Sequence, residues 1–283
     1  MKNKKKIMFI TDSFCGYSKE KLLKDNIILI PHLIYLDDKK YAAGDGFSID
    51  DLCAINPNSY TKALTSLPPV QQLSEIIEKG LEEYEKVIFL TMNENISGTY
   101  SSAKMLENSF ENYHAINSNL TTGTATIDLI KEMRESFENG GDIDDMMKIV
   151  DFYQKNTKCY IIPLDLIRLE KSGRIKGAAK IIFKKLNLIP VLALRDLGIK
   201  VNGVKRSAKS AIGSIIDKLH EFNGVMANFE LLQSNNKEIN SIVDMKFKSI
   251  GIDNYLINNA PIAALVHTGP GSIGLSSWKK FNS

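Results

Sequence analysis

The sequence predicts an α/β protein of two domains, and three observations support this prediction. The 283 residues suffice for two domains of ordinary size. Strand-like and helix-like segments alternate through the first half, which is typical of a mostly parallel sheet with flanking helices. The second half contains a hairpin signal, which indicates antiparallel pairing. We therefore expect an N-terminal α/β domain over residues 1–157 and a C-terminal α+β domain with a mixed sheet over residues 158–283.

The composition argues against several classes of protein. Hydrophobic residues make up 43% of the chain and charged residues 24%, as in an ordinary soluble globular protein. The net charge of +3 is too small to indicate a nucleic-acid partner. No apolar run approaches the roughly 20 residues of a membrane span. The three cysteines are too scattered for a disulfide framework or a metal site. Because the sequence has neither a membrane-span-like run nor a disulfide framework, we expect a cytoplasmic protein.

Apolar runs and helix signals define the elements expected in the first half. The expected strands cover residues 7–11, 27–35, 87–92 and 114–117. The expected helices cover residues 18–23, 72–84, a segment after Thr99, 124–137 and 144–155. Residues 39–46 have the composition of a turn-rich excursion, and Ser48 is the expected N-cap of the helix that follows it.

The second half mixes strands and helices without strict alternation. Two strand-like runs, 188–195 and 199–205, are joined by Asp196-Leu197-Gly198, a hairpin signal. Further strands are expected over 225–233, 255–257 and 263–267, and helices over 207–222 and 237–250.

A small polar loop around Ser97 and Gly98 is the most informative local feature. It lies between the buried strand expected over 87–92 and the helix that begins after Thr99. Hydroxyls and free backbone N–H groups at such a junction can bind an anion, and Gly98 would let the backbone approach it closely. In parallel sheets ligands bind beyond the carboxyl ends of the strands, where Ser13 also falls. We expect a carboxylate or phosphate here.

Two further polar pairs are candidates for the same site. Thr65 and Ser66 precede Pro68-Pro69, where a hydroxyl can cap the following helix, contact a ligand, or do both. His267 and Thr268 follow an apolar run and precede a Gly-Pro-Gly turn. An imidazole and a hydroxyl can both donate to a carboxylate, although a purely structural histidine is an equally good interpretation.

Arg174 lies in the charged phrase Leu169 to Ile175. Its planar guanidinium suits phosphate or carboxylate, although local chemistry alone favours a solvated turn. The sequence contains no GxSxG, GxxxxGK[ST], HExxH or GxGxxG motif and no zinc-ligand spacing. We therefore expect no catalytic residue, no metal and no cofactor.

Six phrases together suggest a known family. They are Thr11-Asp12-Ser13, Thr65-Ser66-Leu67-Pro68, and the segments 96–103, 169–175, 186–192 and 267–274. In this order they resemble the DegV family of bacterial fatty-acid-binding proteins, over nearly the whole chain. The chain departs from the family pattern in having Leu67 for a usual glutamine, Asn117-Ser118 for aspartate-serine, and Ser172-Gly173 for a glycine pair.

The resemblance implies a function. It implies two domains that enclose one long-chain fatty acid, with the carboxylate near a set of donors and adjacent residues: Thr65, Ser66, Ser97, Gly98, His267 and Thr268. It also implies that Arg174 helps to dock a fatty acid kinase.

We expect a lipid-binding protein that presents the carboxylate to this kinase for acyl-phosphate formation and phospholipid synthesis, with transient membrane contact at most. The alternative is an enzyme acting on a small phosphorylated or carboxylated metabolite in the same crevice. A long dry channel would favour the carrier, and a small polar pocket the enzyme.

Overall fold

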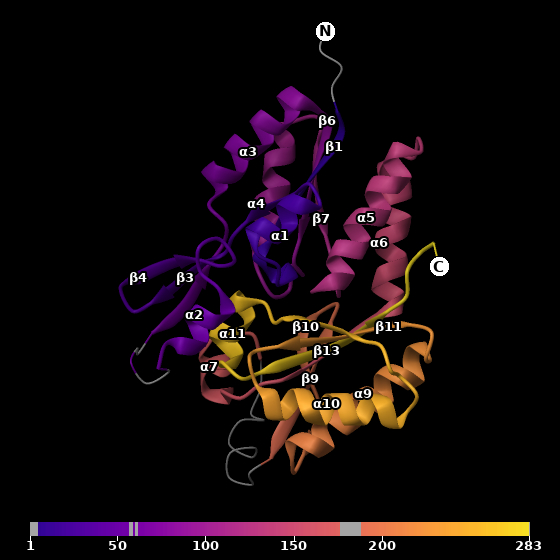
Figure 1. Ribbon diagram of the computed structural model, residues 1–283. Helices are drawn as coiled ribbons and strands as arrows, with labels where there is room; N and C mark the ends of the chain where they lie inside the picture. Colours follow the sequence, from indigo (N-terminus) through magenta and orange to yellow (C-terminus); the bar gives the residue numbers. More distant parts are fainter. Residues whose placement is uncertain (1–4, 57–58, 60–61, 176–187, 283) are drawn as a thin grey trace.

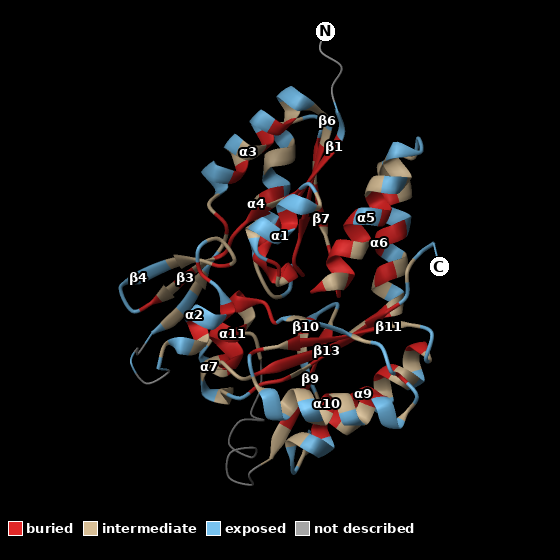
Figure 2. Ribbon diagram, in the orientation of Figure 1, coloured by how far each residue is buried: buried red, intermediate tan, exposed pale blue. Residues whose placement is uncertain are grey.

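The computed structural model describes residues 5–56, 59, 62–175 and 188–282, which form two large sheets, one small sheet and the helices around them (Figure 1). Leu186 and Asn187, part of one phrase named above, lie outside the described residues. Buried residues gather on the strands and on the helix faces that meet them (Figure 2). The predicted fold class is confirmed: an N-terminal parallel sheet and a C-terminal mixed sheet.

The first sheet has the order β2–β1–β6–β7, and all neighbouring strands run parallel. Alternate residues of a strand face opposite sides of its sheet. Along β1, Met8 and Ile10 pack against α3 and α4, whereas Ile7 and Phe9 pack against α5 and α6. The buried centres of these strands are apolar on both faces because helices cover both sides of the sheet. The elements are β1 (Lys5–Asp12), β2 (Ile27–Ile30), β6 (Tyr84–Thr91), β7 (Tyr113–Asn117), α3 (Val70–Glu83), α4 (Thr99–Met105), α5 (Thr124–Glu138) and α6 (Ile143–Asn156).

A small antiparallel sheet, β4–β3–β5, branches from the first domain and corrects two expectations. The strand expected over 27–35 is divided, because Pro31 has no N–H to continue the ladder and the chain turns there into β3. Thr65 and Ser66 lie on β5, and β4 occupies part of the expected turn-rich excursion. The elements are β3 (Leu33–Leu36), β4 (Lys39–Ala42), β5 (Ala63–Ser66), the short helices α1 (Lys19–Lys24) and α2 (Ile49–Ala54), and the 3₁₀ turns η1 (Ser13–Cys15) and η2 (Leu106–Asn108).

The second sheet has the order β10–β9–β8–β13–β11–β12. The predicted hairpin is confirmed by the antiparallel pair β9–β10, while β11 and β12 run parallel. Helices α9 and α10 cover the face of this sheet that points away from the first domain (Figure 1). The elements are β8 (Thr157–Ile162), β9 (Ile189–Arg195), β10 (Gly198–Lys205), β11 (Asn228–Gln233), β12 (Leu256–Asn259), β13 (Ile273–Trp278), α9 (Ala208–Asn223) and α10 (Lys237–Ser249).

The segment before the Gly-Pro-Gly turn is a helix, α11 (Ile262–Thr268), so the prediction of a strand over 263–267 is wrong. A short apolar run does not distinguish a strand from a buried helix, and Ala263 and Ala264 favour the helix. Helix α11 packs against the small sheet and against α7 (Leu166–Lys171), and so brings His267 close to β5.

We propose a domain boundary at residue 157, where α6 has ended and β8 begins.

The end of β13 and the segment after it pack against the first domain. Trp278 Nε1 donates to the Asp128 carboxylate at 3.0 Å, and the Phe281 N–H donates to Glu132 on α5.

A buried carboxylate also joins the two halves. Glu230 on β11 is 0% exposed and accepts hydrogen bonds from the Thr124 N–H, at 3.1 Å to each oxygen, at the start of α5. The Thr124 hydroxyl donates to the same carboxylate at 2.5 Å, and Asn258 Nδ2 does so at 2.6 Å. Burial raises the pKa of Glu230, and these hydrogen bonds oppose the increase. Gly123 directly precedes Thr124 with φ +60°.

We expect Gly123→Ala to lower the free energy of unfolding by about 3 to 5 kcal/mol. The added Cβ would clash with the Glu230 carboxylate and lie 2.7 Å from Leu232 Cδ2, and the φ value adds strain. Urea denaturation measures this loss. Gly140→Ala is the matched control, because Gly140 has φ +97° and nothing within 4 Å of the new carbon. Its loss should be about 1 to 2 kcal/mol, and equal losses for both variants would contradict the prediction.

Candidate functional site

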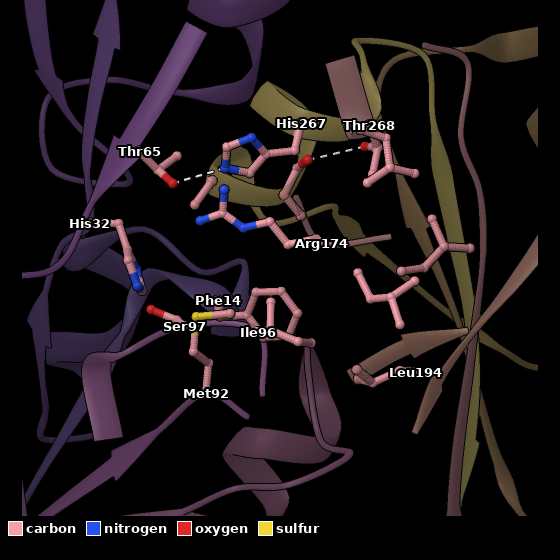
Figure 3. Close-up of a pocket in the computed structure, with 15 residues that line it drawn as sticks. Phe14, His32, Thr65, Met92, Ile96, Ser97, Arg174, Leu194, His267 and Thr268 are labelled. Atoms are coloured by element: carbon pink, nitrogen blue, oxygen red, sulfur yellow. Dashed lines mark hydrogen bonds between the residues drawn. The ribbon is translucent and has the colours of Figure 1, made fainter. Parts of the chain in front are cut away.

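A cavity lies where the carboxyl ends of β1 and β6 face the second sheet, and residues from both halves line it (Figure 3). It encloses about 560 Å³ of space between atoms, part of it open to solvent. One end, which we call the polar end, is formed by Thr65, Ser97, Arg174, His267 and His32. The rest of the wall is mainly apolar, with Phe14, Met92, Ile96, Ile161, Leu169, Leu194 and Ile199 among its residues.

Five of the seven residues singled out from the sequence line this cavity: Thr65, Ser97, Arg174, His267 and Thr268. Ser66 does not line it, because neighbouring residues of β5 point to opposite sides and Ser66 is exposed. Gly98 does not line it either. It is the N-cap of α4 with φ −72°, and a Cβ there would lie 3.6 Å from Leu67 Cδ1. The close backbone approach of Gly98 to an anion stays a prediction.

A hydrogen bond of 2.8 Å between Thr65 Oγ1 and His267 Nε2 joins the small sheet to α11 across the polar end. His267 is 9% exposed. Burial, followed by the nearby charges of Arg174 and His32, lowers the pKa of His267 to about 3. The ring is therefore neutral at pH 7 and offers one donor and one acceptor nitrogen.

Arg174 follows α7 and places its guanidinium in the cavity beside His267 (Figure 3). Its Nη1 donates to the carbonyl of Ser172 at 2.9 Å, which directs the side chain. Burial lowers the pKa of Arg174, but a guanidinium stays protonated in proteins. Arg174 lines the polar end and supplies it with a positive charge, and its part in docking a partner stays a prediction.

His32 is the polar-end residue that the sequence reasoning missed. Its Nδ1 lies 3.0 Å from Ser13 Oγ, and its Nε2 lies 3.1 Å from Thr99 Oγ1. A signal was present in the sequence. Pro31 marks the end of a strand, and His32 directly follows it. His32 therefore lies just beyond a strand end, as Ser13 and Ser97 do.

A second cavity of about 410 Å³, part of it also open to solvent, adjoins the first along the second sheet. The two share the lining residues Phe14, Ile161, Leu194, Ala264 and Thr268. The hydroxyls in the second cavity are bonded to backbone carbonyls. Thr122 donates to Phe14 at 2.8 Å, Ser272 to Thr268 at 2.7 Å, and Thr268 to Ala264 at 3.1 Å. The second cavity therefore presents an apolar surface.

The two cavities together suit an amphiphile with an anionic end. Neutral donors and one guanidinium meet at the polar end, and the apolar space continues away from it. Within the described ranges, no group of three or more His, Cys, Asp or Glu residues is arranged to hold a metal ion. Nor does any helix in the described part of the chain have the length and apolarity needed to cross a membrane.

The fold and this site define a two-domain α/β protein with a cavity between its domains. A sequence model described as "Uncharacterised protein, DegV family COG1307" matches residues 6–280, and the chain belongs to this family. A DegV domain-containing protein of Clostridium acetobutylicum is 29% identical over an alignment of 296 positions. The alignment covers 97% of this chain and 99% of that protein.

Solved structures of the family have the same fold. A fatty acid-binding DegV family protein from Thermus thermophilus superposes with a TM-score of 0.84 at 19% identity, covering 97% of this chain and 99% of its own. DegV from Bacillus subtilis, a fatty acid binding protein, gives 0.83 at 22% identity, with 98% and 100% covered. At these identities the likeness establishes the fold.

We expect His267 to stay neutral well below pH 6.5 in the ligand-free protein, because its folded pKa is about 3. As the pH falls below about 6.5, the unfolded chain binds a proton at this residue and the folded protein does not. The fold should therefore lose about 1.4 kcal/mol per pH unit from this residue between pH 6.5 and 3, and keep its full contribution above that range.

NMR titration of the His267 ring measures the pKa directly, and urea denaturation at pH 7 and pH 5 measures the stability. His267→Gln should lose less stability between these pH values than the wild type. His220→Gln, at the last turn of α9 and away from the cavity, is the control and should behave as the wild type does. An ordinary titration of His267 near pH 6.5 would contradict the assignment.

Proposed function

We propose that this protein binds one long-chain fatty acid between its domains, with the carboxylate at the polar end and the acyl chain along the adjoining cavities. The observation that carries this proposal is that the two cavities adjoin and share five lining residues, one cavity having a polar, cationic end and the other an apolar surface. The fatty acids bound by the Thermus thermophilus and Bacillus subtilis proteins, which share the fold, support the same ligand class.

The energetics favour such a ligand. Each CH₂ group removed from water contributes about 0.8 kcal/mol, so a long acyl chain drives binding into an apolar channel. A carboxylate is costly to bury unless donors surround it. Arg174 supplies a positive charge, and hydrogen-bond donors come from Ser97 and from the bonded pair of Thr65 and His267, which has one proton left for the ligand. These are the roles that we propose for the polar end.

We propose that the protein presents this fatty acid to a separate fatty acid kinase in the cytoplasm. The kinase would transfer the γ-phosphoryl group of ATP to a carboxylate oxygen and release ADP. The binding protein would orient the carboxylate and shelter the chain, and the acyl-phosphate would feed phospholipid synthesis, with transient membrane contact at most. The alternative, an enzyme acting on a small polar metabolite, leaves the apolar second cavity without a role.

Mass spectrometry of the protein purified from cells tests the ligand. We expect the native mass to exceed that of the chain by one long-chain fatty acid, and denaturation to release it. Recovery of no lipid, together with no binding of added palmitate at micromolar concentration, would overturn the proposal.

The kinase step is tested separately. The loaded protein is mixed with ATP and a purified bacterial fatty acid kinase, and acyl-phosphate is trapped with hydroxylamine. No hydroxamate from loaded protein would overturn the kinase role alone.

A matched pair of variants on β5 tests the head-group position. Thr65→Val removes the hydroxyl bonded to His267, and we expect palmitate affinity to fall about tenfold, the value of one hydrogen bond to a charged group. Ser66→Ala removes the neighbouring hydroxyl outside the cavity and should change affinity less than about twofold. Competition with a fluorescent fatty acid measures both. Equal effects would place the carboxylate elsewhere.

A further inference from the structure

An unbroken chain of hydrogen bonds leads from the buried residue Ser13 to the cavity. Ser13 Oγ lies 3.0 Å from His32 Nδ1, His32 Nε2 lies 3.1 Å from Thr99 Oγ1, and Thr99 Oγ1 lies 2.8 Å from Ser97 Oγ. The four residues come from η1, the segment after β2, α4 and the loop before α4. Figure 3 shows the ring of His32 pointing toward Ser97.

Burial requires the inner members of this chain to satisfy one another. Ser13 and His32 are each 3% exposed and Thr99 is 2% exposed, so water does not replace a missing partner. Burial is also the largest influence on the pKa of His32 and lowers it, followed by Asp12, which raises it, and Arg174, which lowers it. A neutral imidazole has one donor and one acceptor nitrogen, and its neighbours decide which is which.

The partners of Ser13 assign the ring protons. Ser13 Oγ accepts a hydrogen bond from the His32 backbone N–H at 3.1 Å. Among the described residues, His32 Nδ1 is the one acceptor within reach of the Ser13 hydroxyl proton. Ser13 therefore donates to Nδ1, and Nε2 carries the ring proton and donates to Thr99 Oγ1.

The same logic continues to the cavity. With its oxygen accepting from His32, the Thr99 hydroxyl donates to Ser97 Oγ, which also accepts from the Thr99 N–H at 3.3 Å. Both lone pairs of Ser97 are then occupied, and its own proton is directed into the cavity that Ser97 lines. If the ring proton were on Nδ1, the chain would run in reverse. Ser97 would then present one free lone pair, because the other accepts from the Thr99 N–H, and this lone pair would repel an anion.

We propose that His32 is a positioning residue that acts through Thr99 to keep the Ser97 hydroxyl as a hydrogen-bond donor to an anionic head group in the cavity. This inference rests on the proposed function for the identity of the head group, a carboxylate. The orientation of the hydrogen-bond chain itself does not depend on the ligand.

Two substitutions of His32 and two ligands test the proposal. His32→Leu removes both ring nitrogens, whereas His32→Gln keeps an acceptor oxygen for Ser13 and a donor amide for Thr99. We expect His32→Leu to weaken palmitate binding about tenfold and binding of the uncharged 1-hexadecanol less than about twofold. His32→Gln should restore most of the palmitate affinity. An equal loss for both ligands, or no rescue by glutamine, would overturn the proposal.

A double-mutant cycle and a spectroscopic measurement complete the test. In a Ser97→Ala background, His32→Leu should cause no further loss of palmitate affinity, and additive losses would exclude action through Ser97. Ring ¹⁵N shifts of His32 in the unsubstituted protein should report a proton on Nε2, and a proton on Nδ1 would overturn the proposal even if His32→Leu fails to fold. If the unsubstituted protein binds neither palmitate nor hexadecanol, the proposed function fails, and the ¹⁵N shifts still decide the direction of the chain.

Discussion

The shape of the cavity depends on one buried carboxylate, that of Asp12 at the end of β1. Asp12 is 1% exposed and accepts hydrogen bonds from the N–H groups of Phe14 at 2.9 Å and Met92 at 2.7 Å. Met92 follows β6, the parallel neighbour of β1, so this carboxylate joins the ends of two strands. Burial raises the pKa of Asp12, while His32 and the two N–H groups lower it. Because Phe14 and Met92 both line the cavity, one ionisable group fixes the strand ends, part of the apolar wall and the electrostatic surroundings of His32.

The parts of this arrangement that sequence reasoning predicted are those set by local periodicity. The apolar strands of the first domain and the β9–β10 hairpin were expected and are present, because their patterns are strong and need no distant contact. The rule that ligands bind beyond the carboxyl ends of parallel strands directed attention to the loop at Ser97, which lines the cavity. The pairing of Thr65 with His267, 202 residues apart, followed from no local pattern; the family resemblance placed the two residues together.

The parts that were missed depend on tertiary packing. Helix α11 is short and apolar, and burial against the small sheet rather than periodicity decides its conformation. His32 becomes part of the polar end only because the chain leaves the first sheet at Pro31. Arg174 has the composition of an exposed turn, yet packing of α7 against α11 directs its guanidinium inward. For α11 and Arg174 the deciding neighbours are distant in sequence, whereas for His32 the signal is Pro31, the residue directly before it.

The charge balance of the polar end bears on which anion it suits. Arg174 is its one permanent positive charge among the described lining residues, and His32 and His267 are neutral. Protonating His267 at pH 7 would cross four pKa units, which costs about 5 kcal/mol before any ligand is bound. A monoanionic carboxylate needs no such protonation, because one guanidinium and several neutral donors compensate it. A phosphate dianion would leave a second charge unbalanced in a desolvated site. The lowered pKa values of His32 and His267 leave Arg174 as the positive charge of the polar end and therefore favour a carboxylate over a phosphate there.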